Sequence, residues 1–182
     1  KAIGPPPSQL PRRADGTPTT SAQGEGGYTA IPSVAYNGRM HTGDLWDFGP
    51  DAAKGILTTL PPRLVGTPYP ALVPKTDSDG NGVAGIRLPE IAAPFATYNG
   101  WGQRPSGDGC DHYGQIIPFA ATKAERLAAN DPRPSLEERY ASHGVYVAAV
   151  IAAAEKLKSE RFLLGEDVER YRAKAQASNV RR

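Results

Sequence analysis

Hydrophobic residues recur at helical spacing only in the last third of the chain. A segment that begins at Ser142 or Gly144 and ends at Glu160 has apolar residues three and four positions apart, namely Val147, Val150, Ile151, Ala154 and Leu157. This spacing places them on one face of a helix. We therefore expect a long amphipathic helix here, followed by a last helix over residues 166–177.

Two shorter helices are predicted just before this segment from the residues that begin them. Thr122 with Glu125, and Ser135 with Glu138, have the spacing of a capping box, in which the hydroxyl and the carboxylate accept hydrogen bonds from free backbone N–H groups. The first helix should end at Asn130, because a proline follows two residues later. The second should be short and run through the residue after Arg139.

From Tyr28 to Trp101 the apolar runs are short and are broken by glycine and proline, which is typical of strands and turns. The strongest local prediction is a hairpin whose turn is residues 77–82, because Asp-Gly and Asn-Gly pairs lie between two apolar segments. The expected strands are residues 28–31, 34–36, 55–60 (Gly55–Leu60), 69–74 (Tyr69–Pro74) and 83–88 (Val83–Leu88).

These patterns predict an α+β chain with short strands and long loops in the N-terminal half and helices in the C-terminal half. Residues 1–27 are rich in proline and glycine and should form an extended segment, because they bury too little to offset their conformational entropy. Residues 28–119 form the strand-and-loop region. Residues 120–182 form the helical region that packs on it, and together they make one incomplete domain.

Composition narrows the class of protein further. The chain has 182 residues, 39% of them hydrophobic, and a formal net charge of +2, which gives no general attraction to nucleic acid. The longest apolar run, Val145–Ala154, has ten residues; it indicates a buried helix rather than a membrane span, which needs about 18. Cys110 has no second cysteine to pair with, so a disulfide framework is excluded.

The densest polar cluster is residues 108–113, where a cysteine, carboxylates and an imidazole follow one another. Neighbouring side chains in sequence rarely converge on one point, so a loop that leads into an apolar segment is the favoured interpretation. His112 with Asp111 is a weak candidate for catalysis, and Ser106 is a weak candidate nucleophile. No Gly-x-Ser-x-Gly elbow, the usual setting of a hydrolase serine, occurs in the chain.

Asp77, Asp79 and Asn81 alternate in the manner of a calcium-binding loop, with a glycine at the sharp turn. The twelfth position of such a loop needs a bidentate Glu, and Leu88 stands there instead. We therefore interpret the segment as a hairpin turn, keep calcium as the weaker alternative, and expect no metal. No Gly-rich phosphate cradle precedes a helix, and no cofactor is expected.

Several aromatic residues are scattered through the predicted loops and strand ends. They suit the lining of a pocket for an apolar substrate, although anchoring of a loop-rich core explains them as well. The candidates for such a lining are Trp46, Tyr98, Trp101 and Tyr113, with Phe48 and Phe95 nearby in sequence.

Several segments, taken in order, share a pattern that neither composition nor periodicity reveals. They are Pro5–Ser8, Asp47–Pro50, Tyr69–Lys75, Gly85–Glu90, Ala96–Trp101, Ile117–Ala120, Thr122–Arg126 and Asp131–Tyr140. Together they resemble a bacterial family of alpha/beta hydrolase domain-containing proteins, over nearly the whole chain.

The resemblance implies that this chain is the C-terminal portion of an α/β-hydrolase-type protein, a carboxylic ester hydrolase whose substrate is a small ester. The catalytic histidine of the family precedes the stretch matched by Pro5–Pro11, so no catalytic residue is expected here. The partner would be an N-terminal hydrolase core that carries the triad. Apolar surface left without that core predicts self-association. The alternative is a non-catalytic interaction module of α+β type.

Overall fold

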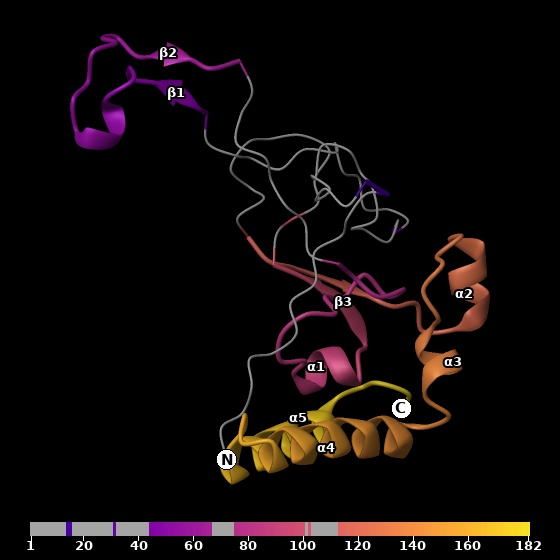
Figure 1. Ribbon diagram of the computed structural model, residues 1–182. Helices are drawn as coiled ribbons and strands as arrows, with labels where there is room; N and C mark the ends of the chain where they lie inside the picture. Colours follow the sequence, from indigo (N-terminus) through magenta and orange to yellow (C-terminus); the bar gives the residue numbers. More distant parts are fainter. Residues whose placement is uncertain (1–13, 16–30, 32–43, 67–74, 101, 103–112) are drawn as a thin grey trace.

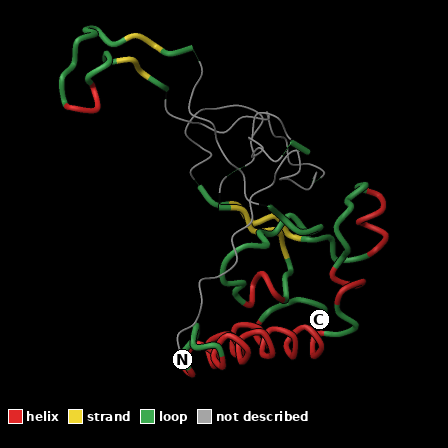
Figure 2. The backbone as a smooth tube through the Cα atoms, viewed as in Figure 1, coloured by secondary structure: helices red, strands yellow, loops and turns green. Residues whose placement is uncertain are grey.

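The computed structural model of the chain describes residues 14–15, 31, 44–66, 75–100, 102 and 113–182. Within these ranges it combines helices with two small antiparallel sheets (Figures 1 and 2). The helices are α1 (Pro89–Ala92), α2 (Lys123–Ala128), α3 (Leu136–Arg139), α4 (His143–Ser159) and α5 (Gly165–Ala177). The strands are β1 (Trp46–Asp47), β2 (Arg63–Leu64), β3 (Ala96–Asn99) and β4 (Gln115–Pro118).

The helices α4 and α5 lie side by side, and α1 packs against α4 (Figure 1). Their contact forms the main core, which consists of Ala93, Tyr140, Tyr146, Val150, Ala175 and Val180. The two long helices lie within a residue of their predicted bounds. The run from Val145 to Ala154 is not buried all round, however, because Val145 is 47% exposed while Ala154 is fully buried.

Both predicted capping boxes are present. The Glu125 backbone N–H donates to Thr122 Oγ1 (3.2 Å), and the Thr122 N–H donates to the Glu125 carboxylate (3.0 Å). Ser135 and Glu138 exchange the same pair of bonds at 3.3 and 2.9 Å. Asn130 has a φ of +53°, in the left-handed region that commonly follows a helix end. The first helix thus ends at Ala128, two residues before the predicted position Asn130.

The strands β3 and β4 pair in antiparallel register from Ala96 opposite Pro118 to Asn99 opposite Gln115. Neither strand is predicted by the residue pattern. Each has only four residues, which is too short for an alternation pattern to stand out. The pairing of β3 with β4 depends on contacts with residues that are distant in sequence. These contacts are described below.

The predicted strand Gly55–Leu60 is wrong. The two-residue strands β1 and β2 pair instead, with Trp46 opposite Leu64. Gly55 ends a short 3-10 helix (Ala52–Lys54) with a φ of +80°, which glycine adopts at little cost. The backbone N–H groups of Thr58 and Thr59 then both donate to the carbonyl oxygen of Phe48, which is a loop geometry.

The turn of the predicted hairpin is confirmed, but the strand Val83–Leu88 that should follow it is not. Thr76 and Gly82 form an isolated antiparallel bridge, and the Asp77 N–H donates to the Asn81 carbonyl at 2.8 Å. Gly85, with a φ of +79°, then turns the chain. The preceding segment, Tyr69–Pro74, lies outside the described residues, as do the strands predicted at 28–31 (except residue 31) and 34–36.

No helix in the described part of the chain is both long and apolar enough to cross a membrane. Apolar side chains are nevertheless exposed along the β1–β2 hairpin, residues 44–66. Six of them are between 39 and 70% exposed: Trp46, Ile56, Leu57, Leu60, Leu64 and Val65.

Candidate functional site

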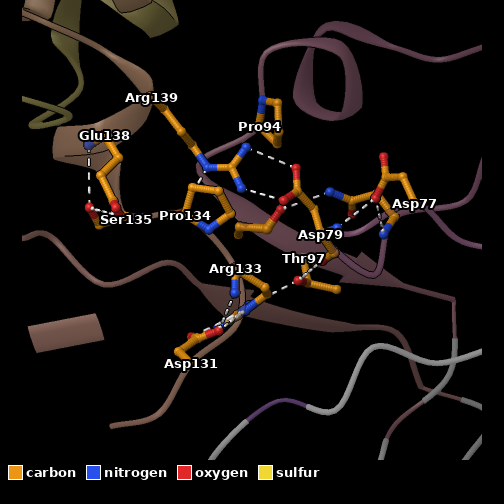
Figure 3. Close-up of polar contacts among 12 residues, drawn as sticks. Asp77, Asp79, Pro94, Thr97, Asp131, Arg133, Pro134, Ser135, Glu138 and Arg139 are labelled. Atoms are coloured by element: carbon orange, nitrogen blue, oxygen red, sulfur yellow. Dashed lines mark hydrogen bonds and ion pairs between the residues drawn. The ribbon is translucent and has the colours of Figure 1, made fainter. Parts of the chain in front are cut away.

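A buried arginine holds the β3–β4 sheet to the segment that precedes α3 (Figure 3). Arg133 is 3% exposed and pairs with the carboxylate of Asp131, whose Oδ2 lies 2.6 Å from its Nη2. Its Nη1 donates to Thr97 Oγ1 on β3 (2.8 Å) and to the Ile117 carbonyl oxygen on β4 (3.0 Å). Its Nη2 also reaches the Pro118 carbonyl oxygen (3.3 Å). One side chain therefore joins three separate segments.

A second arginine extends this network to the hairpin turn. Arg139, on α3, forms a two-pronged ion pair with the carboxylate of Asp79. The ring of Phe119 lies beneath both guanidinium groups, 5.1 Å from that of Arg133 and 4.1 Å from that of Arg139. The Thr97 hydroxyl donates to the Asp79 carbonyl oxygen. We call these contacts of Arg133 and Arg139 the arginine brace.

The hairpin turn is tied to β3 by Asn81, which is fully buried. Its Nδ2 donates to the Ala96 carbonyl oxygen (3.2 Å), and its Oδ1 accepts from the Tyr98 N–H (2.8 Å). Asp77 closes the turn by accepting from the N–H of Asn81 (3.0 Å) and pairs with Arg87 at 2.7 Å. Asn81 thus fixes the backbone of β3 on both sides of Thr97.

These contacts account for the three residues considered as calcium ligands. Asp77 and Asp79 each face an arginine, whose positive charge opposes a nearby cation, and Asn81 uses both its oxygen and its nitrogen on the backbone of β3. Among the described residues no three His, Cys, Asp or Glu side chains are grouped as a metal site.

An open cleft of about 430 Å³ lies on the opposite side of β3 from the arginine brace. Successive side chains of a strand point to opposite faces, so Tyr98 points away from Thr97. The walls are mostly apolar, and the residues that line it are Ile86, Leu88, Glu90, Ile91, Phe95, Tyr98, Ile116 and Lys174. They come from α1, α5, both strands of the sheet and the segment that leads into α1.

Tyr98 is the most unusual polar group of this cleft. Its ring meets Phe95 edge to face, with 5.8 Å between ring centroids. Its hydroxyl is buried and has no hydrogen-bond partner among the described residues. Burial, and secondarily the nearby Glu90 carboxylate, raises the pKa of Tyr98 above the usual tyrosine range.

The charged groups at the edge of the cleft are paired with one another. Glu90 accepts from the Tyr171 hydroxyl at 2.9 Å through Oε2 and from Lys174 Nζ at 3.2 Å through Oε1. Burial, with the hydrogen bond to Glu90, raises the pKa of Tyr171 to about 12. A second open cleft, of about 380 Å³, shares the lining residues Leu88, Glu90 and Lys174 with the first.

Residues 4–173 match the family described as alpha/beta hydrolase domain. This chain belongs to that alpha/beta hydrolase domain family. The match covers nearly the whole chain and confirms the resemblance found in the sequence. It supports a hydrolase-type fold, to which the described residues contribute helices and two small antiparallel sheets. No curated protein and no solved structure matches the chain.

The weak catalytic candidates Ser106, Asp111 and His112 lie outside the described part of this member of the alpha/beta hydrolase domain family, so the expectation that no catalytic residue is present stays a prediction. The aromatic candidate Trp101 also lies outside it. Of the other aromatic candidates, Tyr98 lines the cleft, whereas Trp46 on β1 and Tyr113 before β4 are 45 and 69% exposed. The structure does not bring these three aromatic residues together in that cleft.

The described histidine, His143, has a structural setting. Its Nδ1 lies 2.8 Å from the Val180 carbonyl oxygen, and its Nε2 lies 3.3 Å from that of Gln176. Ser135 and Ser142, the serines nearest to it in sequence, accept hydrogen bonds that cap α3 and α4. His143 therefore anchors the C-terminal segment against the start of α4.

Sequence reasoning missed Arg133 and the pair of Glu90 with Lys174. An arginine is usually exposed, so nothing in the local sequence marks Arg133 as buried. The only available signal was the short spacing of Asp131 and Arg133 across a proline, which allows a local ion pair. Glu90 and Lys174 are 84 residues apart, and no pattern joins them.

Two carboxyl groups, Asp131 in the brace and Glu138 on α3, have a pKa that is lowered in the folded chain. The hydrogen bond from Arg126, then the Ser135 N–H, lowers the pKa of Glu138 to about 2 from its ordinary 4.5. Burial works to raise the pKa of Asp131, but its hydrogen bonds from Arg133 outweigh burial and lower it. In both cases folding favours the charged carboxylate. Its contribution to the free energy of unfolding is therefore fully present above the pKa of the unfolded chain, and it is lost as the pH falls through the pKa of the folded chain.

We therefore expect the free energy of unfolding to decrease as the pH falls from about 4.5 toward about 2. Urea unfolding followed by circular dichroism across this range measures the effect. For Glu138→Gln the free energy of unfolding should decrease less over this range than for the wild type. For Glu166→Gln, which changes a 65% exposed side chain, it should decrease as much as for the wild type. Parallel curves for all three proteins would contradict the assignment to Glu138.

Proposed function

We propose that this chain is part of a serine hydrolase that acts on carboxylic esters, and that its described residues form one wall of the substrate pocket. The nucleophile and its histidine base would come from a hydrolase core outside this sequence. The observation that carries the proposal is a mostly apolar cleft at Tyr98 in a chain of the alpha/beta hydrolase domain family.

The size and lining of the cleft support a small-molecule site. A volume of about 430 Å³ lies within the range of about 300–1,000 Å³ typical of ligand pockets. Such pockets combine apolar walls with a few polar groups that fix orientation. Here Ile86, Ile91 and Ile116 suit the acyl or alcohol part of an ester, and the polar groups in the wall are Glu90 and Lys174.

The arginine brace supports the same role, because a substrate wall must be held in place. Binding constellations are more exact when they sit on rigid elements with a supporting layer of hydrogen bonds. Arg133 joins β3 to β4, and Asn81 holds the Tyr98 backbone N–H at 2.8 Å. The backbone of Tyr98 is thus held by contacts outside the cleft.

The proposal that the catalytic groups lie outside this chain also rests on the structural roles of Ser135, Ser142 and His143. Ester hydrolysis by a serine needs a base within hydrogen-bond reach and backbone amides that stabilise the oxyanion. His143 contacts two carbonyl oxygens, and Ser135 and Ser142 cap helices. The sequence has no Gly-x-Ser-x-Gly elbow.

The exposed apolar side chains of the β1–β2 hairpin give the missing core a contact surface. On this proposal Trp46, Leu60 and Leu64, which are 45, 70 and 57% exposed, pack against the core in the intact enzyme. The same exposure favours the second candidate function, a non-catalytic interaction module. The two differ in whether ester turnover accompanies binding of the partner.

The test is the hydrolysis of p-nitrophenyl butyrate by the purified 182-residue chain. We expect a rate indistinguishable from that of buffer for the chain alone. We expect serine-dependent turnover when the chain is co-expressed with the region of its gene that encodes a core with an elbow serine. An inactive complex would favour the interaction module.

The control is Ser106→Ala, which removes the weak nucleophile candidate of this chain. The wild-type chain and this variant should behave alike. Turnover by the isolated wild-type chain that is abolished in Ser106→Ala would overturn the proposal, because the nucleophile would then lie within this sequence.

A further inference from the structure

We infer that the two open clefts form one groove along α5, and that this groove takes an ester whose aliphatic chain has about eight carbons. The inference rests on the proposed function and deepens it, because it names the class of substrate. It also names Leu163 as the residue that selects the length of the chain. We call the two clefts together the α5 groove.

The two clefts adjoin, because Leu88, Glu90 and Lys174 line both of them. From these shared residues the first cleft, of about 430 Å³, extends to the β3–β4 sheet, where Ile116 lines it. The second cleft, of about 380 Å³, extends in another direction to Leu163, which lies just before α5. A ligand longer than the first cleft can therefore continue into the second.

The helix α5 sets the length of the second cleft. Asp167, Arg170, Tyr171 and Lys174 line it at spacings of three and four residues, which places them on one face of the helix. From Asp167 to Lys174 the helix rises about 10 Å, at about 1.5 Å per residue. Each C–C bond spans about 1.5 Å, so a chain that follows this face needs at least about seven carbons. A butanoyl chain is too short.

The lining suits an aliphatic chain, because its charged groups are paired with one another. Lys174 Nζ lies 3.2 Å from Glu90 Oε1, and Arg170 Nη1 lies 3.1 Å from Asp167 Oδ1. The methylene groups of Lys174 add apolar surface at the junction of the clefts. Leu88, which is 41% exposed, lies at the same junction. Covering these groups removes apolar area from water, which favours binding.

The experiment compares methyl butanoate with methyl octanoate, which share the same ester group, on the 182-residue chain by ligand-observed NMR. Complete burial of one CH₂ group strengthens binding about 4-fold. Because the groove is open, we expect the CH₂ groups that octanoate adds to strengthen binding by about 10-fold in total. In Leu163→Ala this advantage should fall to about 3-fold, while the affinity for methyl butanoate stays unchanged.

The matched control is Leu164→Ala, because Leu164 is the next residue, is 65% exposed and lines neither cleft. It should keep the wild-type advantage of methyl octanoate, which separates binding in the groove from general attraction to apolar surface. If Leu163→Ala fails to fold, the wild type decides. Nuclear Overhauser effects are then expected between the terminal methyl group of methyl octanoate and the methyl groups of Leu163.

Equal affinities of the two esters for the wild type would overturn the inference, and so would no binding of either ester. An advantage of methyl octanoate that is fully retained in Leu163→Ala, or no Overhauser effect to Leu163, would also overturn it. Binding is measured without turnover, so failure here is distinct from failure of the ester assay. A complex that hydrolyses p-nitrophenyl butyrate, built on a chain that ignores ester length, would refute this inference alone.

Discussion

Replacement of Arg133 by Met is expected to lower the free energy of unfolding by about 3–5 kcal/mol, the usual cost of removing one partner of a buried ion pair. Asp131 is 7% exposed and would keep its charge without the guanidinium that compensates it. Thr97 Oγ1 and the Ile117 carbonyl oxygen would lose a donor as well. Urea unfolding followed by circular dichroism measures the change.

Arg170→Met is the matched control for this prediction. Arg170 lies on α5 and is 72% exposed, and its ion pairs among the described residues are with acidic residues three and four positions away on the same helix. Exposed pairs of this kind contribute about 0–1 kcal/mol. If both variants lost the same small amount of stability, Arg133 would not be the centre of the brace.

The second large effect is expected for Asn81→Leu, a change that keeps the approximate size of the side chain. Leucine can replace neither the donor to the Ala96 carbonyl oxygen nor the acceptor for the Tyr98 N–H. Each unsatisfied buried group costs about 1–3 kcal/mol, so for two groups we expect a loss of about 2–6 kcal/mol in the free energy of unfolding.

The comparison for Asn81→Leu is Asn179→Leu, which changes an exposed asparagine near the C-terminus. Substitutions on the surface usually alter stability by less than about 0.5 kcal/mol. An Asn81→Leu variant as stable as Asn179→Leu would show that the hairpin turn does not hold β3 in place.

The helices from α2 to α5 could be predicted because their signals are local. The hydroxyl of Thr122 and the carboxylate of Glu125 are three residues apart, and their spacing alone specifies the bonds that begin α2. In α4 the apolar positions repeat with the period of the helix, and Val150 and Leu157 are buried as that period requires. Such elements depend little on the rest of the chain.

The short strands could not be predicted, because distant residues decide them. Ala96 pairs with Pro118, and the carbonyl oxygens of β4 are held by Arg133. The apolar run Gly55–Leu60 looked more like a strand than β3 does. Gly55–Leu60 forms a loop instead, because Gly55 adopts left-handed geometry and the segment hydrogen-bonds to Phe48. Tertiary context outweighs local strand propensity in both places.

The candidate site was partly visible in the sequence. Tyr98 belonged to the predicted aromatic lining, and it lines the cleft, although its contact with a substrate stays a prediction. Asp77, Asp79 and Asn81 were correctly interpreted as a turn. What could not be foreseen is that Arg139 and Arg87 pair with Asp79 and Asp77 of that turn, because a single sequence does not show which arginine meets which carboxylate.

The decisive measurement is turnover of p-nitrophenyl butyrate by the purified chain, because we propose that this sequence provides a wall of the substrate pocket and not the attacking group. We expect no turnover above buffer by the 182-residue chain, and serine-dependent turnover once a hydrolase core is supplied. Turnover by the chain alone, lost on Ser106→Ala, would contradict that proposal.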